Sequence, residues 1–178
     1  MNTFKYIGGS LHCEGVDLSA LEEKHGTPSY VYSKKTIEEN AKAYVNSFTN
    51  TRNLACFAVK SLSNLSILKI IKDAGCGFDI VSGGELHRVL SIGAEPKKII
   101  FSGVGKTKNE IQQGIDSGIL SFNVESESEL YRIEKIADGI GSPASISIRI
   151  NPDIDSGGHE YITTGRKGDK FGISDTRK

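Results

Sequence analysis

Lys60 is the first residue whose position suggests a chemical role, because it directly follows the most apolar run of the chain, Leu54 to Val59. A lysine at such a place is partly desolvated, and desolvation favours the neutral amine, which can form a Schiff base with an aldehyde. The alternative is a lysine whose charged head reaches water from the end of a strand. Position alone favours this alternative, so the chemistry needs support from other residues.

Asp79 and Arg149 form a second candidate pair. Both lie at the ends of apolar runs, where side chains of neighbouring elements would converge. An inward-facing arginine needs an acidic partner, because an unpaired buried charge is costly. We therefore expect an ion pair between the two side chains. Such a pair can be purely structural or can serve a binding site, and the residues leave both interpretations open.

His159 lies in a long glycine-rich polar segment, 151–172, that follows the last predicted strand. An active-site loop would be expected at this place, because loops at strand ends often carry function. The plain alternative is a solvated loop histidine. On residue type and position alone, the alternative is preferred.

Two glycine-rich segments could hold an anion. Ser82 to Glu85 lies between a predicted strand and a predicted helix, where backbone amides can bind an anion, although a plain turn is the commoner explanation. Ile100 to Thr107 is similar to the phosphate loop G-x-x-x-x-G-K-[ST], but isoleucine replaces its first glycine. No apolar strand ending in a magnesium-binding aspartate follows, so nucleotide hydrolysis is not favoured.

The composition excludes several classes of protein. The chain has 178 residues with 22 basic and 22 acidic side chains, so it carries no net charge and no nucleic-acid footprint. The cysteines Cys13, Cys56 and Cys76 are scattered, which supports neither a disulfide framework nor a metal site. No apolar run approaches the length of a membrane span, and no signal peptide is evident. We expect a soluble, cytoplasmic protein.

Short apolar runs alternate with amphipathic stretches of helical length, and this alternation predicts parallel βα units. The strands are expected at 30–32, 54–59, 77–81, 98–102, 120–124 and 145–150. The helices are expected at 34–48, 65–74, 84–92, 108–117 and 127–137. The run 54–59 has no polar alternation, which is typical of a strand that helices cover.

The strand at 145–150 places its isoleucines on one face and Ser145, Ser147 and Arg149 on the other. A (β/α)8 barrel encloses such a polar face near an active site at the carboxyl ends of its strands. The rival, an open doubly wound sheet, is weakened because no G-x-G-x-x-G follows the first strand. We therefore expect an α/β barrel. The polar residues expected at its mouth are Ser33, Lys60, Asp79, Ser82, Ser102, Asn123, Glu125, Arg149 and Asn151.

The chain is too short for a closed barrel, which needs eight βα units and about 250 residues. We expect an N-terminal lead-in segment at 1–26 and an incomplete barrel of about six units at 27–178, so the chain is interpreted as a fragment. In an open barrel, apolar residues suited to a closed interior would meet water. These include Phe57, Val59, Ile148 and Ile150.

Several segments in order carry a resemblance to one family. They are Phe57 to Ser61, Asn64 to Leu68, Gly77 to Leu86, Ile99 to Lys106, Phe122 to Glu127, Arg149 to Asp153, Gly158 to Gly165 and Lys170 to Ile173. Together they resemble the diaminopimelate decarboxylases, which belong to the barrel-fold pyridoxal-phosphate decarboxylases of the alanine racemase type. The matches cover most of the chain, and the last two blocks resemble these enzymes rather than the ornithine or arginine decarboxylases.

The resemblance implies a cofactor, a substrate and roles for individual residues. Lys60 matches the lysine that forms the Schiff base with pyridoxal 5'-phosphate, and Asp79 and Arg149 match residues on the floor of the cofactor site. His159 matches a mobile loop beside the substrate, and Lys170 matches a lysine near a dimer interface. The family converts meso-2,6-diaminopimelate to L-lysine and carbon dioxide, the last step of lysine biosynthesis, as homodimers with shared active sites. No metal is implied.

The chain departs from the family pattern in two ways. Ser61 and Leu62 stand where the family often has alanine and asparagine, and the family's remaining cofactor and substrate residues come later than Lys178. The resemblance therefore assigns the activity to a longer parent, and this chain alone is expected to be inactive. Two alternatives stay open: a non-catalytic pyridoxal-phosphate-binding barrel protein, and a truncated product without function.

Overall fold

The computed structural model describes residues 3–48, 50–154, 157, 159, 164–165 and 171–174. The N-terminal part is an antiparallel sheet of β1 (Phe4–Ile7), β2 (Ser10–Cys13) and β3 (Val16–Asp17), followed by α1 (Leu18–His25). Gly8 and Gly9, with φ of 59° and 89°, form the two-residue turn between β1 and β2. Positive φ at both positions suits a tight hairpin turn and favours glycine. The sequence pattern predicted no helix or strand in this segment.

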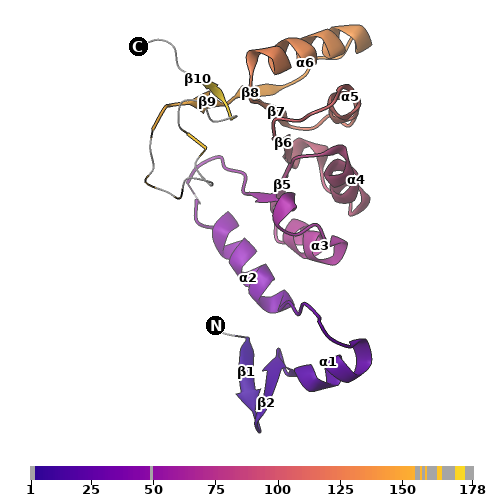
Figure 1. Cartoon of the computed structure of the whole chain (residues 1–178), viewed down its shortest axis with the longest axis vertical. Coiled ribbons are helices and arrows are strands. Elements are labelled where there is room, and N and C mark those ends of the chain that lie inside the picture. The colour runs from indigo at the N-terminus through magenta and orange to yellow at the C-terminus, as the bar shows by residue number, and fades with distance from the viewer. Residues whose placement is uncertain are drawn as a thin grey trace.

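A parallel sheet of five strands forms the centre of the molecule, in the order β4-β5-β6-β7-β8. The strands are β4 (Cys56–Ala58), β5 (Gly77–Ile80), β6 (Ile99–Phe101), β7 (Ser121–Val124) and β8 (Ile146–Ile148). The helices are α2 (Lys34–Val45), α3 (Leu65–Asp73), α4 (Gly83–Ser91), α5 (Lys108–Asp116) and α6 (Glu127–Ile140), with short 3-10 turns at Val59–Ser61 and Pro96–Lys98. The predicted alternation is confirmed, and α3 to α6 stack along one side of the sheet (Figure 1).

The expected strand at 30–32 is wrong. This segment is not a strand in the structure, and Tyr30 is 91% exposed. β10 (Ile173–Ser174) instead pairs in parallel with β9 (Ile150–Asn151) in a separate two-stranded sheet. β9 follows β8 after Arg149, and the carbonyl oxygen of Arg149 accepts from the amide of Ile173 at 2.8 Å. Tyr-Val-Tyr has high strand propensity, but propensity forms a strand only where a neighbour offers hydrogen-bonding partners.

The apolar core lies between the sheet and the stacked helices. Paired residues of parallel strands share a face, and the helix-facing set includes the fully buried residues Phe78, Ile80, Ile99, Phe101, Phe122 and Val124. The rings of Phe101 and Phe122 stack with centroids 5.9 Å apart. Burying each such side chain contributes roughly 1.5–3 kcal/mol to the stability of the fold.

The opposite face of the sheet is largely polar. Asp79 on β5, Asn123 on β7 and Ser147 on β8 share this face by register. Ser147 and Ser121 join neighbouring strands through a hydroxyl contact of 3.0 Å. Polar side chains on the inner face agree with the expectation from the 145–150 pattern.

Exposure of the apolar residues differs in part from expectation. Ile148 and Ile150 are 50% and 54% exposed, as expected for an incomplete barrel. Val59, which was expected to meet water, is fully buried, because it begins the 3-10 turn after β4 and packs into the core. Phe57 is partly buried against the same core. No helix in the described ranges is long and apolar enough to cross a membrane.

Gly77 and Gly114 allow close packing around the sheet. A Cβ on Gly77 would collide with the backbone carbonyl oxygen of Lys98, so glycine lets β5 approach the segment before β6. A Cβ on Gly114 would lie 2.6 Å from Cζ of Phe122, so glycine lets α5 sit directly on β7. Both glycines are required by contact rather than by backbone conformation.

Candidate active site

The carboxyl ends of the parallel strands meet at one edge of the sheet, and the candidate residues lie along that edge. Lys60 lies in the turn after β4, Asp79 lies in β5 opposite Ala58, and Arg149 lies between β8 and β9. Side chains at this edge of a barrel converge on a shared site. The strand order therefore places Lys60 and Asp79 at the ends of neighbouring strands and sets Arg149 further along.

Lys60 lies in a short, well-fixed turn. The amide of Leu62 donates to the carbonyl oxygen of Val59 at 3.1 Å, and the Ser61 hydroxyl donates to Ala58 at 2.7 Å. Lys60 itself is exposed, so the expected desolvation of its amine is wrong for this chain. The reason is that Val59 turns into the core while the next residue leaves the strand toward solvent.

Asp79 holds an unsatisfied acceptor. Its Oδ1 is buried and has no hydrogen-bond partner, and it is the one side-chain polar atom of this kind in the described part of the chain. A buried acceptor without a donor costs about 1–3 kcal/mol. Such an atom points to a donor from a bound group, because buried polar atoms in folded proteins are otherwise paired.

Cys56 lies on the same face as Asp79, one strand away. Burial raises the pKa of the Cys56 thiol to about 11, and the negative charge of Asp79 and the proximity of Cys76 add to the rise. The thiolate is the nucleophilic form of cysteine. Cys56 is therefore unsuited to act as a nucleophile at neutral pH.

The expected ion pair between Asp79 and Arg149 is wrong. Arg149 Nη1 lies 3.3 Å from both carboxylate oxygens of Glu125, at the end of the neighbouring strand β7. Asp79 lies on β5, three strands away from β8. Neighbouring strands are about 4.8 Å apart, so three steps put roughly 14 Å between the two backbones. Arg149 pairs with Glu125 because Glu125 lies at the end of the neighbouring strand. The sequence pattern did not predict which strands are neighbours.

Lys106 of the glycine-rich loop does not face an open anion site. Its Nζ lies 2.6 Å from Oε1 of Glu129, and the two side chains are 0% and 6% exposed. The same amine donates to the carbonyl oxygens of Gly103 and Asn123 at 2.7 and 2.8 Å. The lysine that suggested a phosphate loop is thus a buried structural cation.

Ser82 to Glu85 forms an ordinary helix start. The Ser82 hydroxyl accepts from the Glu85 amide at 3.2 Å, and Glu85 accepts from the Val81 amide at 2.7 Å. Glu110 of the next helix accepts from the Gly83 amide at 2.8 Å. Burial would raise the pKa of Glu110, but the hydrogen bonds from Gly83 and Thr107 outweigh it and lower the pKa. Carboxylates of the protein already occupy this helix terminus.

The remaining candidates have different outcomes. Ser33 does not lie at the strand edge: it caps α2 and donates to Glu14 at 2.6 Å, because the segment before it is not a strand. His159 is exposed, and its place beside a substrate stays a prediction. Lys170 lies outside the described residues. Asn123 and Ser102 do meet at the edge, through a hydrogen bond of 2.8 Å.

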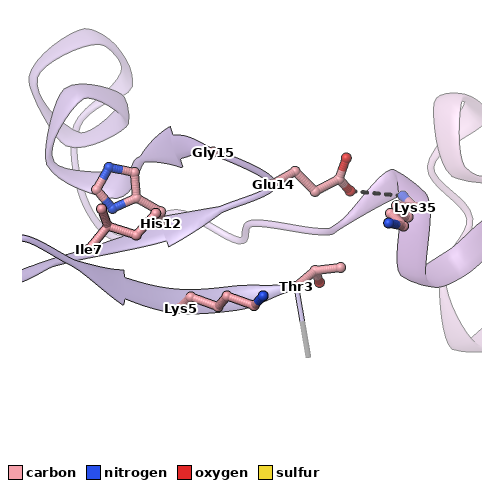
Figure 2. Close-up of a pocket in the computed structure, with 7 residues that line it drawn as sticks. All are labelled: Thr3, Lys5, Ile7, His12, Glu14, Gly15 and Lys35. Carbon is pink, nitrogen blue, oxygen red and sulfur yellow. Dashed lines mark hydrogen bonds between the residues drawn. The ribbon is translucent and has the colours of Figure 1, made fainter. Parts of the chain in front are cut away.

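A separate hollow of about 350 Å³ lies beside the N-terminal sheet (Figure 2). Its lining residues are Thr3, Lys5, Ile7, His12, Glu14, Gly15 and Lys35. Glu14 reaches from this sheet to the start of α2, where it accepts from the Lys35 amide at 2.8 Å. Lys60, Asp79 and Arg149 do not line this hollow, so it is unrelated to the candidate site.

Comparison with known proteins decides the family. Residues 34–178 match the model of the pyridoxal-dependent decarboxylases, in their pyridoxal binding domain. The chain belongs to this family. Its similarity to diaminopimelate decarboxylase from Pseudomonas aeruginosa is 48% identity over 98% of this chain and 42% of that protein. The Haemophilus influenzae enzyme gives the same identity and coverage.

Solved structures of the family share the fold. Diaminopimelate decarboxylase from Helicobacter pylori, complexed with L-lysine, is 45% identical with a TM-score of 0.85, over 89% of this chain and 40% of that chain. The enzyme from M. jannaschii, also with L-lysine, is 37% identical with a TM-score of 0.87, over 98% of this chain and 42% of that one. The chain thus spans less than half the length of the relatives it matches.

The described residues fit the ring end of pyridoxal phosphate, the cofactor of this family. Pyridoxal phosphate carries an aldehyde that reacts with a primary amine, and protonated ring groups that donate hydrogen bonds. Lys60 offers an exposed amine at the edge of the sheet, and Oδ1 of Asp79 lacks a donor. The two glycine-rich loops are engaged by Glu110 and Glu129, so they do not provide a phosphate site.

Proposed function

We propose that this chain is the N-terminal, cofactor-binding part of a diaminopimelate decarboxylase, which releases carbon dioxide from meso-2,6-diaminopimelate and forms L-lysine. Identity near 48% to enzymes of this name supports the assignment. The observation that carries it is the unpaired buried Oδ1 of Asp79 on the strand beside the Lys60 turn. A primary amine and an orphaned acceptor at one edge suit the aldehyde of the cofactor and a hydrogen-bond donor on its ring.

Each residue of the edge has a distinct task in this proposal. Lys60 would hold the cofactor through its primary amine, which is exposed at this edge. Asp79 accepts a hydrogen bond from the bound ring and orients it, which removes the cost of its unpaired oxygen. Arg149 places a positive charge further along the same edge. When bound, pyridoxal phosphate supplies the electron sink for the electron pair left by the departing carboxylate.

Catalysis belongs to the longer protein rather than to residues 1–178 alone. This chain spans about 42% of the length of its relatives, and we expect it to show no decarboxylation by itself. We also propose a cytoplasmic homodimer in which partner subunits share active sites, with His159 on a loop beside the substrate. The barrel unit of this proposal begins near residue 27.

The test uses a chimera in which this chain replaces the matching region of Pseudomonas aeruginosa diaminopimelate decarboxylase. Pyridoxal phosphate is added, borohydride fixes the Schiff base, and peptide mapping locates the label. We expect the label on the peptide containing Lys60 and carbon dioxide release from meso-diaminopimelate. Lys60→Ala should lose both, whereas Lys69→Ala, at an exposed helix lysine, should keep both.

Three results would contradict the proposal. Label spread over surface lysines would remove the assignment of Lys60. Faster release of carbon dioxide from ornithine, arginine or lysine than from diaminopimelate would overturn the assignment of the substrate. Cofactor bound at Lys60 without turnover of any amino acid would favour a non-catalytic pyridoxal-phosphate protein instead.

A further inference from the structure

We infer that Glu125 is a positioning residue that fixes the guanidinium of Arg149 at the carboxyl edge, and that cofactor binding depends on it through Arg149. The inference rests on the proposed function for the identity of the bound group. It adds a residue that the resemblance did not assign. The geometry of three neighbouring strands carries it.

Glu125 and Arg149 differ sharply in their exposure. The side chain of Glu125 is 2% exposed, whereas that of Arg149 is 40% exposed. Both carboxylate oxygens of Glu125 lie 3.3 Å from Nη1 of Arg149. A buried anion therefore anchors one end of the guanidinium while the arginine still reaches the open edge.

The backbone of Glu125 is itself held in place by a buried carboxylate of α6. Its amide donates to Oε2 of Glu129 at 3.0 Å, and Oε1 of Glu129 pairs with Lys106 at 2.6 Å. Lys106 also donates to the carbonyl oxygen of Asn123, which lies in β7 two residues before Glu125. This buried chain of contacts joins α6, the loop before α5 and the end of β7, so Glu125 has little freedom to move.

The other side of Arg149 is held by the segment that leads into β10. The Phe171 ring centre lies 4.8 Å from Cζ of Arg149, within the range of a cation–π contact. The amide of Gly172 donates to Oε2 of Glu125 at 3.2 Å. A Cβ on Gly172 would lie 3.1 Å from the carbonyl oxygen of Arg149, so glycine permits this close approach. Arg149 is thus held between an anion and an aromatic ring.

A purely structural role for Glu125 makes a different prediction. In that case loss of the carboxylate charge would lower the stability of the β7–β9 edge, and the change in cofactor affinity caused by Glu125→Gln would be the same with or without Arg149. A positioning role requires the effect on affinity to disappear when Arg149 is removed, because the two residues then act through one contact.

The experiment is a double-mutant cycle in the chimera, with Glu125→Gln, Arg149→Met and the double variant. Pyridoxal phosphate affinity is measured by equilibrium titration of its absorbance, and thermal unfolding is recorded without cofactor. Glu110→Gln is the matched control, because Glu110 is a hydrogen-bonded carboxylate that does not contact Arg149. A second readout, independent of the cofactor, is the rate at which phenylglyoxal modifies Arg149, followed by mass spectrometry.

We expect Glu125→Gln to weaken cofactor binding about tenfold, the size of one lost charge-assisted hydrogen bond. The double variant should bind no more weakly than Arg149→Met, and Arg149 should react faster with phenylglyoxal in Glu125→Gln. Additive losses, or an affinity equal to that of Glu110→Gln, would overturn the inference. Absence of any Schiff base at Lys60 in the unsubstituted chimera would instead refute the proposed function, and the inference with it.

Discussion

The isoleucine strip, defined as Ile146, Ile148 and Ile150, should control the association of this chain in solution. The three residues alternate along β8 and β9 and therefore share one face, the face that the helices cover on the other strands. They are 39%, 50% and 54% exposed, so about half of their apolar surface meets water. Full burial of one such side chain is worth roughly 1.5–3 kcal/mol, so the strip forfeits about 2–4 kcal/mol in total.

That loss is large beside a typical net stability of about 5–15 kcal/mol, and association would recover part of it. The unsubstituted 178-residue chain should therefore form ill-defined oligomers or aggregate. Replacing all three isoleucines of the strip with threonine keeps β-branched side chains but removes apolar surface, so it should shift the chain toward monomer. Size exclusion with light scattering at two protein concentrations measures the shift.

Val104→Thr is the control, because Val104 is 45% exposed but lies outside the strip. It should leave the oligomer distribution unchanged. A sharp monomer peak with a cooperative thermal transition for the unsubstituted chain would refute this reasoning. It would also favour a small self-sufficient domain over an incomplete barrel.

Two further predictions concern a buried ion pair and a half-buried thiol. Lys106→Met in the chimera should lower the free energy of unfolding by about 3–5 kcal/mol, because it leaves the buried carboxylate of Glu129 without its cation. Lys106→Met with Glu129→Leu should recover only part of this loss in denaturant titration, because the Glu125 amide and the carbonyl oxygens of Gly103 and Asn123 then lack their partners. A loss below about 1 kcal/mol in the single variant would show that the pair is hydrated. Because the pKa of Cys56 is raised to about 11, its thiolate forms only as the pH approaches that value. Its alkylation rate should therefore keep rising through pH 9 to 10, where a free cysteine levels off, and a plateau near pH 9 would disprove the burial effect.

The periodic parts of the sequence determined most of the barrel layer. The run before Lys60, the isoleucine alternation at 145–150 and the amphipathic stretches each predicted an element that the structure contains. These signals are local, since a strand or helix buried on one face must repeat its apolar residues with the matching period. The polar inner face followed from the same alternation, as the contact between Ser121 and Ser147 shows.

Only the tertiary structure decided which strands pair and which charged side chains form ion pairs. Tyr30 to Tyr32 has the composition of a strand but is not a strand in the structure, whereas Ile173–Ser174 is too short to be found by pattern and becomes one because β9 offers it a parallel neighbour. Arg149 required an anion, but which anion depended on strand order, and the neighbouring β7 supplied Glu125. Lys106 matched part of a phosphate loop, and the packing of α6 turned it into the partner of Glu129.

The sequence and the tertiary structure also determined different features of the candidate site. Residue type and position singled out Lys60 and Asp79, since a lysine and an aspartate at the ends of consecutive strands must share one edge of a parallel sheet. Their state was not in the sequence: Lys60 is exposed, and Oδ1 of Asp79 is buried without a donor. Exposure and hydrogen bonding depend on every neighbour in space, and neighbours in space are set by the pairing of strands rather than by the residues themselves.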